Sequence, residues 1–467
     1  MKKHHFSAFA LLLLTLISVG RAQNTVDVSK MTARPTVDWA RDGVIYEIYP
    51  RAFSAAGGLN GVTARLDDLK KLGVNILWLM PINPIGVKNK KGSIGSPYAV
   101  RDYYAINPAY GTKADLKRLV HEAHARGMKV ILDEVLNHTA WDNKLITEHP
   151  EFYKHDANGK IMYPEDWTDV AWLDYSNPKL RTYMIKMLTY WMKEFDLDGF
   201  RFDVAHKPPT DFWEQARVAL EKVKPDVFWL EEGDRPDEEL KAMDADYSWD
   251  LHNALSAVWQ GKKPATAIRE SWQKQHDTWP KGALHMRFSD NHDEWRAIAR
   301  FGEPGALAAQ ALMFTLDGIP LVYNGMEVGD ATESGAPALF ENLKIFWPIA
   351  ERRPEFPRFY RGMIALRKSS EALRRGDVEW VSNTNDVCII SFERHTTTED
   401  ALVVINSCNR PEKAHLDAAV NGFTEVTPNI TGANPAPTGD AATADVTLAA
   451  WGFHVYQRTP NAQVEIH

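Results

Sequence analysis

The sequence has few cysteines, no basic cluster beyond its first residues, and only one long apolar run. Its 467 residues include two cysteines, Cys388 and Cys408, and carry a formal net charge of −8. Two late cysteines match no zinc or redox spacing. An exported protein could pair them, but thiols in neighbouring strands are as often plain core residues, so the sequence leaves their pairing open. The acidic balance argues against a nucleic-acid partner.

The one long apolar run lies at the N-terminus. Lys2 and Lys3 precede an apolar stretch over residues 6–19, and small residues follow up to Ala22. This order predicts a signal peptide over residues 1–22 and export, either to the periplasm or to the medium. The run is too short to cross a bilayer comfortably, and no other segment is long and apolar enough. We therefore expect no membrane span after cleavage of the signal.

Aromatic residues, in contrast, are abundant. The chain has 16 Trp, 15 Tyr and 19 Phe, while its apolar and charged fractions, 44% and 25%, are ordinary for a globular protein. Many of these aromatics stand beside Gly, Pro, Asp or Asn. Aromatic faces stack on the apolar faces of sugar rings, so this pattern suits a carbohydrate groove. Core packing is nevertheless the commoner role of any single aromatic.

Short apolar strands alternate with amphipathic helices from about residue 42 to residue 345. Good N-cap residues, Thr112 and Asn177, mark the starts of two of the helices. The pattern predicts an α/β fold, a TIM (β/α)8 barrel over residues 36–138 and 176–370. The eight predicted strands are Val44–Tyr49, Asn75–Met80, Lys129–Asp133, Gly199–Asp203, Val227–Glu231, Asp246–Trp249, Leu284–Phe288 and Ile319–Tyr323.

Two stretches interrupt this alternation. Residues 139–175 form a long polar connection after the third strand, and we interpret them as a small inserted domain B, because so long a loop in a compact domain is usually functional. Its tryptophans either pack this domain onto the barrel or stack on a sugar. Over residues 371–467, short alternating strands and turn-rich sequence such as 435–439 predict a C-terminal antiparallel β-sandwich. The tryptophans of the insertion are Trp141, Trp167 and Trp172.

Acidic residues stand at four of the predicted strand ends. Asp133, Asp203, Glu232 and Asp293 end or follow the third, fourth, fifth and seventh strands. Because the chemistry of such barrels lies at the C-terminal ends of the strands, we expect these carboxyl groups to converge on one mouth. Cleavage of a glycosidic bond needs two carboxyl groups in different protonation states. The arrangement therefore favours a glycosidase.

The residues beside two of these acids suggest their roles. Arg201 and Asp203 are two apart in a strand and share a face, so we expect the guanidinium to keep Asp203 ionised, as a nucleophile requires. Glu232 has no cation at the equivalent offset, and Trp229 and Leu230 precede it. We therefore expect a raised pKa for Glu232, which suits a proton donor.

These segments, in this order, resemble the α-amylase family, glycoside hydrolase family 13, over nearly the whole mature chain. The resemblance implies Asp203 as nucleophile, Glu232 as general acid/base, and Asp293 as a third carboxylate that binds sugar hydroxyls. Four segments resemble the family's catalytic regions, and two more segments resemble the signatures of its first and eighth strands. They are residues 133–138, 199–206, 230–232 and 290–293, with 44–53 and 318–327.

The resemblance also implies substrate contacts. Tyr98 would be the aromatic platform under the sugar at the cleavage site, His138 and His292 would hydrogen-bond its hydroxyls, and His206 would lie on the leaving-group side. Arg201 would act in the same site. The alternatives are structural. The histidines would be core residues whose hydrogen bonds are made within the protein, and Arg201 would form an ion pair with a buried Asp133.

Two departures from the family pattern affect these expectations. Glu231 replaces the small residue usual before the acid/base; since side chains alternate along a strand, only one of the two glutamates can face the mouth, and the motif register favours Glu232. The loop over residues 54–60 lacks the aspartates that bind calcium in many relatives, so we expect no calcium there. Asn137 matches the family's structural calcium ligand, but its partner acids are not identifiable, and the chemistry needs no cofactor.

The sequence thus predicts a retaining hydrolase that cleaves α-1,4-glucosidic bonds in starch-type glucans or malto-oligosaccharides by double displacement. One alternative is an α-1,6-acting, cyclomaltodextrinase-type or transglycosylating relative, because Val204 after the nucleophile is a feature of α-1,6-acting members. A second alternative is a non-catalytic glucan-binding protein. It is less favoured because all three acid positions are filled.

Overall fold

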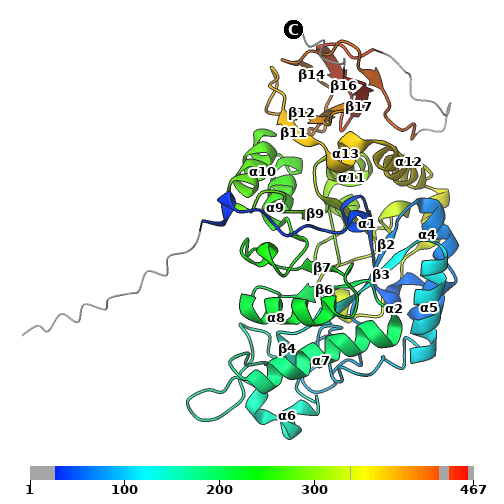
Figure 1. Cartoon of the computed structure of the whole chain (residues 1–467). Coiled ribbons are helices and arrows are strands. Elements are labelled where there is room, and N and C mark those ends of the chain that lie inside the picture. The colour runs from blue at the N-terminus through cyan, green and yellow to red at the C-terminus, as the bar shows by residue number, and fades with distance from the viewer. Residues whose placement is uncertain (1–26, 337, 431–440, 461–467) are drawn as a thin grey trace, which may run out of the picture.

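The computed structural model describes residues 27–336, 338–430 and 441–460 (Figure 1). The predicted signal peptide over residues 1–22 and the turn-rich segment 435–439 lie outside these ranges. Within them, no helix has the length and apolar character needed to cross a bilayer. In Figure 1 the barrel occupies the middle of the molecule, the C-terminal strands lie at the top, and the inserted segment with β4 and α6 lies at the bottom.

Eight parallel strands form the barrel, in the order β7-β6-β3-β2-β1-β10-β9-β8. A parallel bridge between Leu230 and Ala245 joins β7 to β8 and closes the ring. The predicted TIM barrel is therefore confirmed. The strands are β1 (Ile45–Ile48), β2 (Ile76–Leu79), β3 (Lys129–Val135), β6 (Gly199–Asp203), β7 (Phe228–Glu231), β8 (Asp246–Tyr247), β9 (His285–Arg287) and β10 (Ile319–Tyr323).

Helices surround these strands, and the two predicted N-caps are present. Thr112 and Asp115 form a reciprocal capping box at α5, and the Asn177 side chain accepts from the Lys179 N–H at α7. The α-helices are α1 (Asp38–Arg41), α2 (Pro50–Phe53), α3 (Gly58–Thr63), α4 (Leu66–Leu72), α5 (Lys113–Ala125), α6 (Leu145–Glu148), α7 (Pro178–Phe195), α8 (Thr210–Glu221), α9 (Trp249–Trp259), α10 (Thr266–Thr278), α11 (Ala297–Thr315), α12 (Glu355–Ser369) and α13 (Glu371–Arg375). The 3₁₀ helices are η1 (Val28–Lys30), η2 (Pro150–Phe152), η3 (Glu238–Leu240), η4 (Met326–Val328), η5 (Ala338–Phe340) and η6 (Trp347–Glu351).

Alternate residues along each barrel strand pack into an inner core and an outer core. Ile45, Trp78, Leu230 and Met286 belong to the buried cluster inside the ring. A larger cluster fills the layer between the strands and the helices. Because neighbouring positions on a strand face opposite sides, each residue's place in the strand decides whether it meets the interior or the helix layer.

The segment after β3 carries a small antiparallel sheet, as the predicted domain B requires. Its strands are β4 (His138–Ala140) and β5 (Val170–Trp172), which pair with His138 opposite Trp172. The Trp141 indole donates to the Thr168 carbonyl at 2.9 Å, so this tryptophan ties the insertion together. The bond therefore connects the two ends of the segment between β4 and β5.

The C-terminal strands form an antiparallel five-stranded sheet, ordered β11-β12-β13-β17-β15, and a two-stranded sheet of β14 and β16. A separate buried cluster that includes Leu402, Val404 and Phe423 fills the space among them. The antiparallel β prediction for this end of the chain is confirmed. The strands are β11 (Asp377–Trp380), β12 (Ile389–His395), β13 (Asp400–Asn406), β14 (Glu412–His415), β15 (Thr424–Glu425), β16 (Asp445–Leu448) and β17 (Phe453–Arg458).

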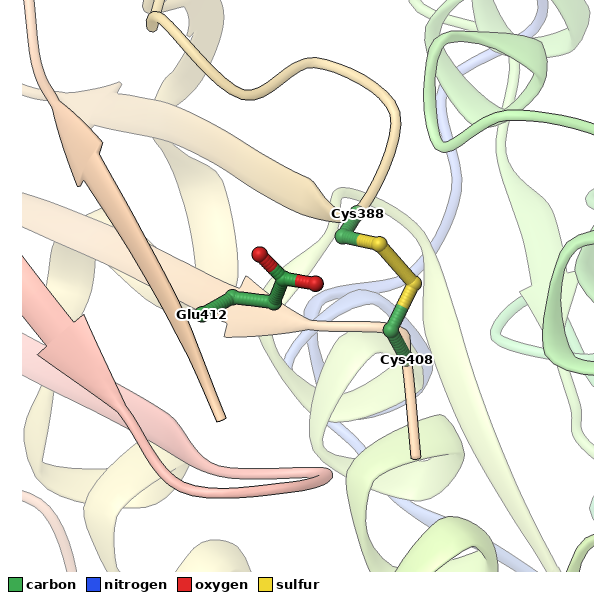
Figure 2. A group of neighbouring side chains, drawn as sticks. All are labelled: Cys388, Cys408 and Glu412. Carbon is green, nitrogen blue, oxygen red and sulfur yellow. A yellow bond between two sulfur atoms is a disulfide. The ribbon is translucent and has the colours of Figure 1, made fainter. Parts of the chain in front are cut away.

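The two cysteines, whose pairing the sequence left open, form a disulfide. Figure 2 shows Cys388 and Cys408 joined beside Glu412 in the C-terminal domain. Because both sulfurs are in the disulfide, neither is a thiolate that could bind a metal with this glutamate. The bond instead links the start of β12 to the end of β13.

Removing this disulfide should destabilise the C-terminal domain. The cysteines are 20 residues apart, and closing a loop of that size lowers the entropy of the unfolded chain by an amount worth about 3 kcal/mol. A Cys388→Ala/Cys408→Ala variant should therefore unfold at lower urea concentration. Wild type treated with a reductant is the control and should match the variant, whereas an unchanged midpoint in both would contradict this prediction.

Candidate active site

A cavity of about 510 Å³ opens at the C-terminal ends of the barrel strands. This volume lies within the range of roughly 300–1,000 Å³ typical of small-molecule sites. Acids, histidines and aromatic rings share its wall. The lining residues are Lys91, Ser96, Tyr98, His138, Glu165, Trp167, Asp169, Val170, Asp203, Val204, His206, Glu232, Trp249, Asp293, Ala336, Leu339 and Phe340.

Arg201, near the end of β6, is the electrostatic centre of this cavity. Its side chain is fully buried, and its Nη1 lies 2.8 Å from Asp133 Oδ1 and 3.2 Å from Asp203 Oδ1. Its Nη2 lies 2.8 Å from Glu232 Oε2. Its Nε donates to the Tyr247 hydroxyl at 3.1 Å. One guanidinium therefore holds carboxyl groups from β3, β6 and the end of β7 around a single point.

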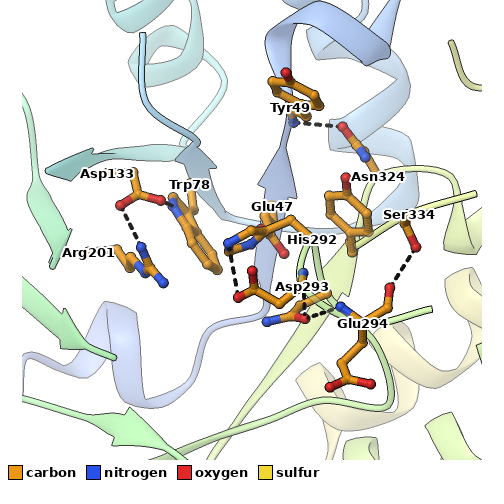
Figure 3. Close-up of polar contacts among 12 residues, drawn as sticks. Glu47, Tyr49, Trp78, Asp133, Arg201, His292, Asp293, Glu294, Asn324 and Ser334 are labelled. Carbon is orange, nitrogen blue, oxygen red and sulfur yellow. Dashed lines mark hydrogen bonds and ion pairs between the residues drawn. The ribbon is translucent and has the colours of Figure 1, made fainter. Parts of the chain in front are cut away.

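Asp133 is a structural partner of this arginine. It is fully buried, and its Oδ2 accepts from the Trp78 indole and from the Tyr98 hydroxyl, both at 3.1 Å. Both carboxylate oxygens are thus engaged by buried protein groups, and Asp133 does not line the cavity. The structure thus contains the ion pair between Asp133 and Arg201 that the sequence suggested as the structural alternative (Figure 3).

A second chain of polar contacts runs from β1 to the cavity through His292. The Nδ1 of His292 hydrogen-bonds the fully buried Glu47, and its Nε2 lies 3.2 Å from Asp293 Oδ2 (Figure 3). The Tyr98 hydroxyl lies 2.7 Å from the same Nε2, and the two rings stack with centroids 5.3 Å apart. Burial alone would lower the pKa of His292, but the Asp293 and Glu47 carboxylates raise it to about 9. His292 therefore enters the site as a cation at neutral pH.

The raised pKa of His292 predicts a pH dependence of stability. A histidine whose folded pKa exceeds its unfolded value of 6.5 stabilises the fold fully below pH 6.5, and that contribution disappears as pH rises through 9. The loss should amount to about 3 kcal/mol. Replacing Glu47 with Gln removes one of the two raising charges and should shrink this loss. Urea unfolding at pH 6 and pH 9.5 measures it.

Glu341→Gln is the matched control for Glu47→Gln. Glu341 accepts from Ser93 at the surface and contacts no histidine. This variant should keep the wild-type difference between pH 6 and pH 9.5. An equal pH dependence in Glu47→Gln and in wild type would show that Glu47 does not control the charge of His292.

The pKa directions of the two central carboxyl groups differ from the sequence prediction, which is wrong on this point. Arg201 contacts Glu232 as well as Asp203, because β6 and β7 are neighbours and the guanidinium spans both. Burial raises the pKa of Asp203 well above its usual range despite Arg201. Burial also acts to raise the pKa of Glu232, but Arg201 and the Val204 N–H outweigh it and hold that pKa below its usual value.

The turn after β6 contributes directly to this arrangement. The Val204 N–H donates to Glu232 Oε2 at 3.0 Å. Val204 has φ of +48°, which is strained for a β-branched residue and costs on the order of 1–3 kcal/mol. Strain of this kind concentrates at functional sites, and here it aims one backbone donor at a cavity carboxylate.

The two adjacent glutamates point to opposite sides of the barrel wall. Glu232 lines the cavity and contacts Arg201, whereas Glu231 is fully buried and does not line it. The alternation of β7 explains this difference, since Leu230 belongs to the inner core. The side chain that faces the mouth is that of Glu232, as the motif register predicts.

The remaining predicted contacts also lie at the cavity. His206 and His138 line it, and burial lowers the pKa of His138 to about 4. The Asn137 amide nitrogen lies 3.2 Å from His138 Nδ1, so the proton of this neutral ring sits on Nε2. Trp167 lines the cavity while its ring meets His138 edge-on, so it both packs domain B and faces the cavity. Trp172 does not line the cavity; its ring instead lies under the Lys154 ammonium.

Asn137, the predicted calcium ligand, makes hydrogen bonds to neighbouring side chains instead. Its Oδ1 accepts from the Trp172 indole at 3.1 Å. Calcium takes six to eight oxygen ligands, several of them from carboxylates. In the described part of the chain, no group of three closely spaced carboxylate or histidine ligands includes a neighbour of Asn137. The side chains around Asn137 therefore do not fit a calcium ion as they are arranged here.

Sequence reasoning missed several residues of the site. Glu47 holds His292 from β1, Tyr247 supports Arg201, and Trp249 and Phe340 line the cavity. Glu47 could have been found, because a carboxylate inside the apolar run Val44–Tyr49 needs a buried partner. Phe340 gave no comparable signal, since it follows a long connection after β10.

Comparisons with known proteins agree with this geometry. Residues 47–170 and 164–347 match the family model described as "Alpha amylase, catalytic domain". The structure is similar to a noncanonic maltogenic α-amylase from Thermotoga neapolitana, with a TM-score of 0.77 and 32% identity over 90% of this chain and 97% of that one.

Two relatives extend the comparison to sequence. "Alpha-amylase 2" of Dictyoglomus thermophilum is 28% identical over 417 residues, 81% of this chain and 72% of that protein. A cyclomaltodextrinase of Geobacillus thermopakistaniensis is 27% identical over 484 residues, 90% of this chain and 77% of that protein. Together with the family model, which spans well over half of the chain, these matches show that the protein belongs to the α-amylase family, glycoside hydrolase family 13, and is an α-amylase-like hydrolase.

Proposed function

We propose that this enzyme cleaves α-1,4-glucosidic bonds in starch-type glucans or malto-oligosaccharides with retention of configuration. The proposal rests on one observation above the others. Asp203 and Glu232 line the same cavity and are bound by the two terminal nitrogens of one buried guanidinium. Two carboxyl groups so placed are what glycosidic cleavage by double displacement needs.

In the first step, Asp203 attacks the anomeric carbon while Glu232 gives its proton to the glycosidic oxygen. The bond to that oxygen breaks, the shortened glucan leaves with a hydroxyl group, and a β-glucosyl ester forms on Asp203. In the second step, Glu232 takes a proton from water, whose oxygen attacks the anomeric carbon. The α-product leaves, and Asp203 is regenerated as a carboxylate. No metal ion takes part in these steps.

Asp293 and His292 assist these steps. Asp293 lies against the His292 ring, and carboxylate oxygens beside a cationic imidazole can accept hydrogen bonds from sugar hydroxyls while imidazole N–H groups donate. Such contacts, when they tighten around the oxocarbenium-like transition state, lower the barrier. Tyr98 offers its ring face to the same sugar, and His138 lines the wall beside it.

The protonation states that this mechanism needs belong to the pair and not to either acid alone. Asp203 and Glu232 share Arg201, and one proton on the pair can reside on either carboxyl group. In the substrate-free site, burial raises the pKa of Asp203, while Arg201 and the Val204 N–H outweigh burial and lower the pKa of Glu232. Cleavage requires the proton on Glu232 and the charge on Asp203.

The substrate class is supported by the aromatic wall of the cavity. Tyr98, Trp167, Trp249 and Phe340 present rings beside the acids, which suits the alternating apolar and hydroxylated faces of glucose units. The α-1,6 or cyclomaltodextrinase alternative is favoured by Val204 at the cavity and by a cyclomaltodextrinase among the relatives. A non-catalytic binding role is disfavoured by the complete set of acids.

We further propose that the protein is exported, either to the periplasm or to the medium. The N-terminal basic, apolar and small-residue pattern supports export. The disulfide between Cys388 and Cys408 is consistent with an oxidising compartment. Fractionation of the producing cells, followed by N-terminal sequencing of the mature chain, tests both parts of this proposal.

A product profile tests the activity. The mature protein, with and without Asp203→Asn, is incubated with soluble starch, maltoheptaose, β-cyclodextrin, pullulan and isomaltose, and the products are separated by chromatography. We expect malto-oligosaccharides from starch and maltoheptaose, and none from the variant. Turnover confined to β-cyclodextrin, or to pullulan and isomaltose, would replace the α-1,4 assignment with the cyclomaltodextrinase or α-1,6 one. Binding without any turnover would refute catalysis.

A further inference from the structure

The outer faces of β7, β8 and β9 carry charged side chains where a barrel strand normally presents apolar ones. Leu230, Tyr247 and Met286 face the inner core. Their neighbours Glu231, Asp246 and His285 therefore point outward into the helix layer. The first two are fully buried and His285 is 5% exposed.

The covering layer is also unusual at this point. Between β7 and β8 the chain has only the short 3₁₀ helix η3 in place of a full barrel helix. Apart from Leu240, η3 consists of Glu238 and Glu239, both buried. Outward carboxylates on the strands thus meet carboxylates on the covering segment.

Several oxygens of this cluster lack partners. Within the described residues, no N–H or O–H group donates to either carboxylate oxygen of Glu231 or to Oε1 of Glu239. The Glu231 carboxyl group instead contacts that of Glu238, and Asp246 lies beside the Trp279 indole. No lysine or arginine in that part of the chain forms an ion pair with Glu231, Glu239 or Asp246, because Arg34 and Arg217 bind Asp244 and Arg287 binds Asp317. Buried carboxylates without partners are expensive unless a cation or a proton neutralises them.

Three side chains of the cluster converge on one point. The ligand atoms of Glu239, Asp246 and His285 all lie within 4.8 Å of one another. A metal ion about 2.0–2.2 Å from each ligand atom would draw these atoms to within about 4.4 Å of one another. The His285 Nδ1 hydrogen-bonds Asp246 Oδ1, and the Leu284 N–H donates to Glu239 Oε2 at 3.2 Å. A bound cation would displace the proton between the histidine and the aspartate.

We propose that Glu239, Asp246 and His285 bind one divalent transition-metal cation of the Zn²⁺ or Mn²⁺ type on the outside of the barrel. Mixed carboxylate and imidazole ligands suit these ions, whereas Ca²⁺ prefers oxygen alone. Glu231, which is also fully buried, lies on the adjoining strand β7. The ion fastens η3 to β8 and β9 where the barrel lacks a helix, directly behind the strand end that carries Glu232.

Metal analysis of the untagged, full-length mature protein tests this site. We expect about one equivalent of divalent metal after purification without chelator. After EDTA treatment and dialysis, titration with Zn²⁺ alone and with Mn²⁺ alone should recover one site, with release of a proton. The midpoint of thermal unfolding should rise by about 3 °C when either ion is present at 100 times its dissociation constant.

Variants distinguish the site from adventitious binding. Asp246→Asn and His285→Gln should each weaken Zn²⁺ and Mn²⁺ binding at least tenfold. The matched controls Asp277→Asn and His276→Gln, both exposed on the adjacent α10, should bind as wild type does. If either buried variant fails to fold, Glu239→Gln on the short η3 serves in its place, and the stoichiometry of wild type still decides the question.

Three outcomes would overturn the proposal. Wild type that binds neither ion has no such site. Binding that persists unchanged in Asp246→Asn, His285→Gln and Glu239→Gln lies elsewhere. A chelated wild type whose unfolding midpoint does not respond to metal, together with an Asp246→Asn variant that is more stable than wild type, would mean that protons neutralise the cluster.

Discussion

Asp203→Asn is expected to lower kcat/KM on maltoheptaose by at least about 10⁴-fold. The amide is isosteric with the carboxyl group and can keep a contact to Arg201, but it cannot form the glucosyl ester through which double displacement proceeds. The fold should be unchanged, because the substitution alters neither volume nor burial. Steady-state kinetics together with far-ultraviolet circular dichroism measures both.

Restoring activity with azide tests the role of the same residue more strictly, because the configuration of the product identifies the face that the missing nucleophile occupied. An Asp203→Gly variant leaves space on the β-face of the sugar, and azide placed there should displace fluoride from α-maltosyl fluoride to give β-maltosyl azide. Asp211→Asn, which changes an exposed aspartate on α8 that pairs with Arg181, should keep full activity. Residual wild-type-like hydrolysis in Asp203→Asn, or an α-azide from Asp203→Gly, would remove Asp203 from the role of nucleophile.

The barrel was predictable because its strands carry a local signal. The predicted bounds of two strands, Gly199–Asp203 and Ile319–Tyr323, are those of β6 and β10. Continuous apolar runs between amphipathic helices require burial on both faces, which only a parallel sheet covered by helices provides. The caps Thr112 and Asn177 could be predicted for the same reason, because a capping residue acts within one turn of its own helix.

The convergence of the acids was predictable from topology alone. Parallel strands in a closed barrel end on the same face, so acids at their C-terminal ends must meet whatever their separation in sequence. Asp203, Glu232 and Asp293 accordingly line one cavity. Alternation along β7 also separates Glu231 from Glu232, because it is a property of the strand itself.

The electrostatics could not be predicted in the same way. The offset between Arg201 and Asp203 describes contacts along one strand, but the guanidinium is long enough to reach Glu232 on the neighbouring strand. Glu47 and His292 are 245 residues apart and meet only because β1 lies beside the barrel mouth. Charges of this kind depend on side chains from other strands, which the sequence pattern of one strand does not specify.

Glu232→Gln is expected to affect the two steps of catalysis differently, depending on the leaving group of the substrate. On maltoheptaose, whose leaving oxygen needs a proton, kcat/KM should fall by about 10²–10⁴-fold, the usual contribution of a general acid. With α-maltosyl fluoride the leaving group needs no proton, so the first step should remain within about tenfold of wild type. Because the second step lacks its base, the glucosyl ester on Asp203 should accumulate and appear as a burst of fluoride.

Azide then distinguishes the acid/base from the nucleophile through the configuration of the product. Azide needs no base, so it should release the ester that accumulates in Glu232→Gln by attack on the α-face, giving α-maltosyl azide. This is the opposite configuration to the product expected from Asp203→Gly. Glu214→Gln, on the outer helix α8 beside Lys241, is the control and should behave as wild type. Equal losses on maltoheptaose and on the fluoride would show that Glu232 holds the site together without transferring a proton, because a purely structural role does not depend on the leaving group.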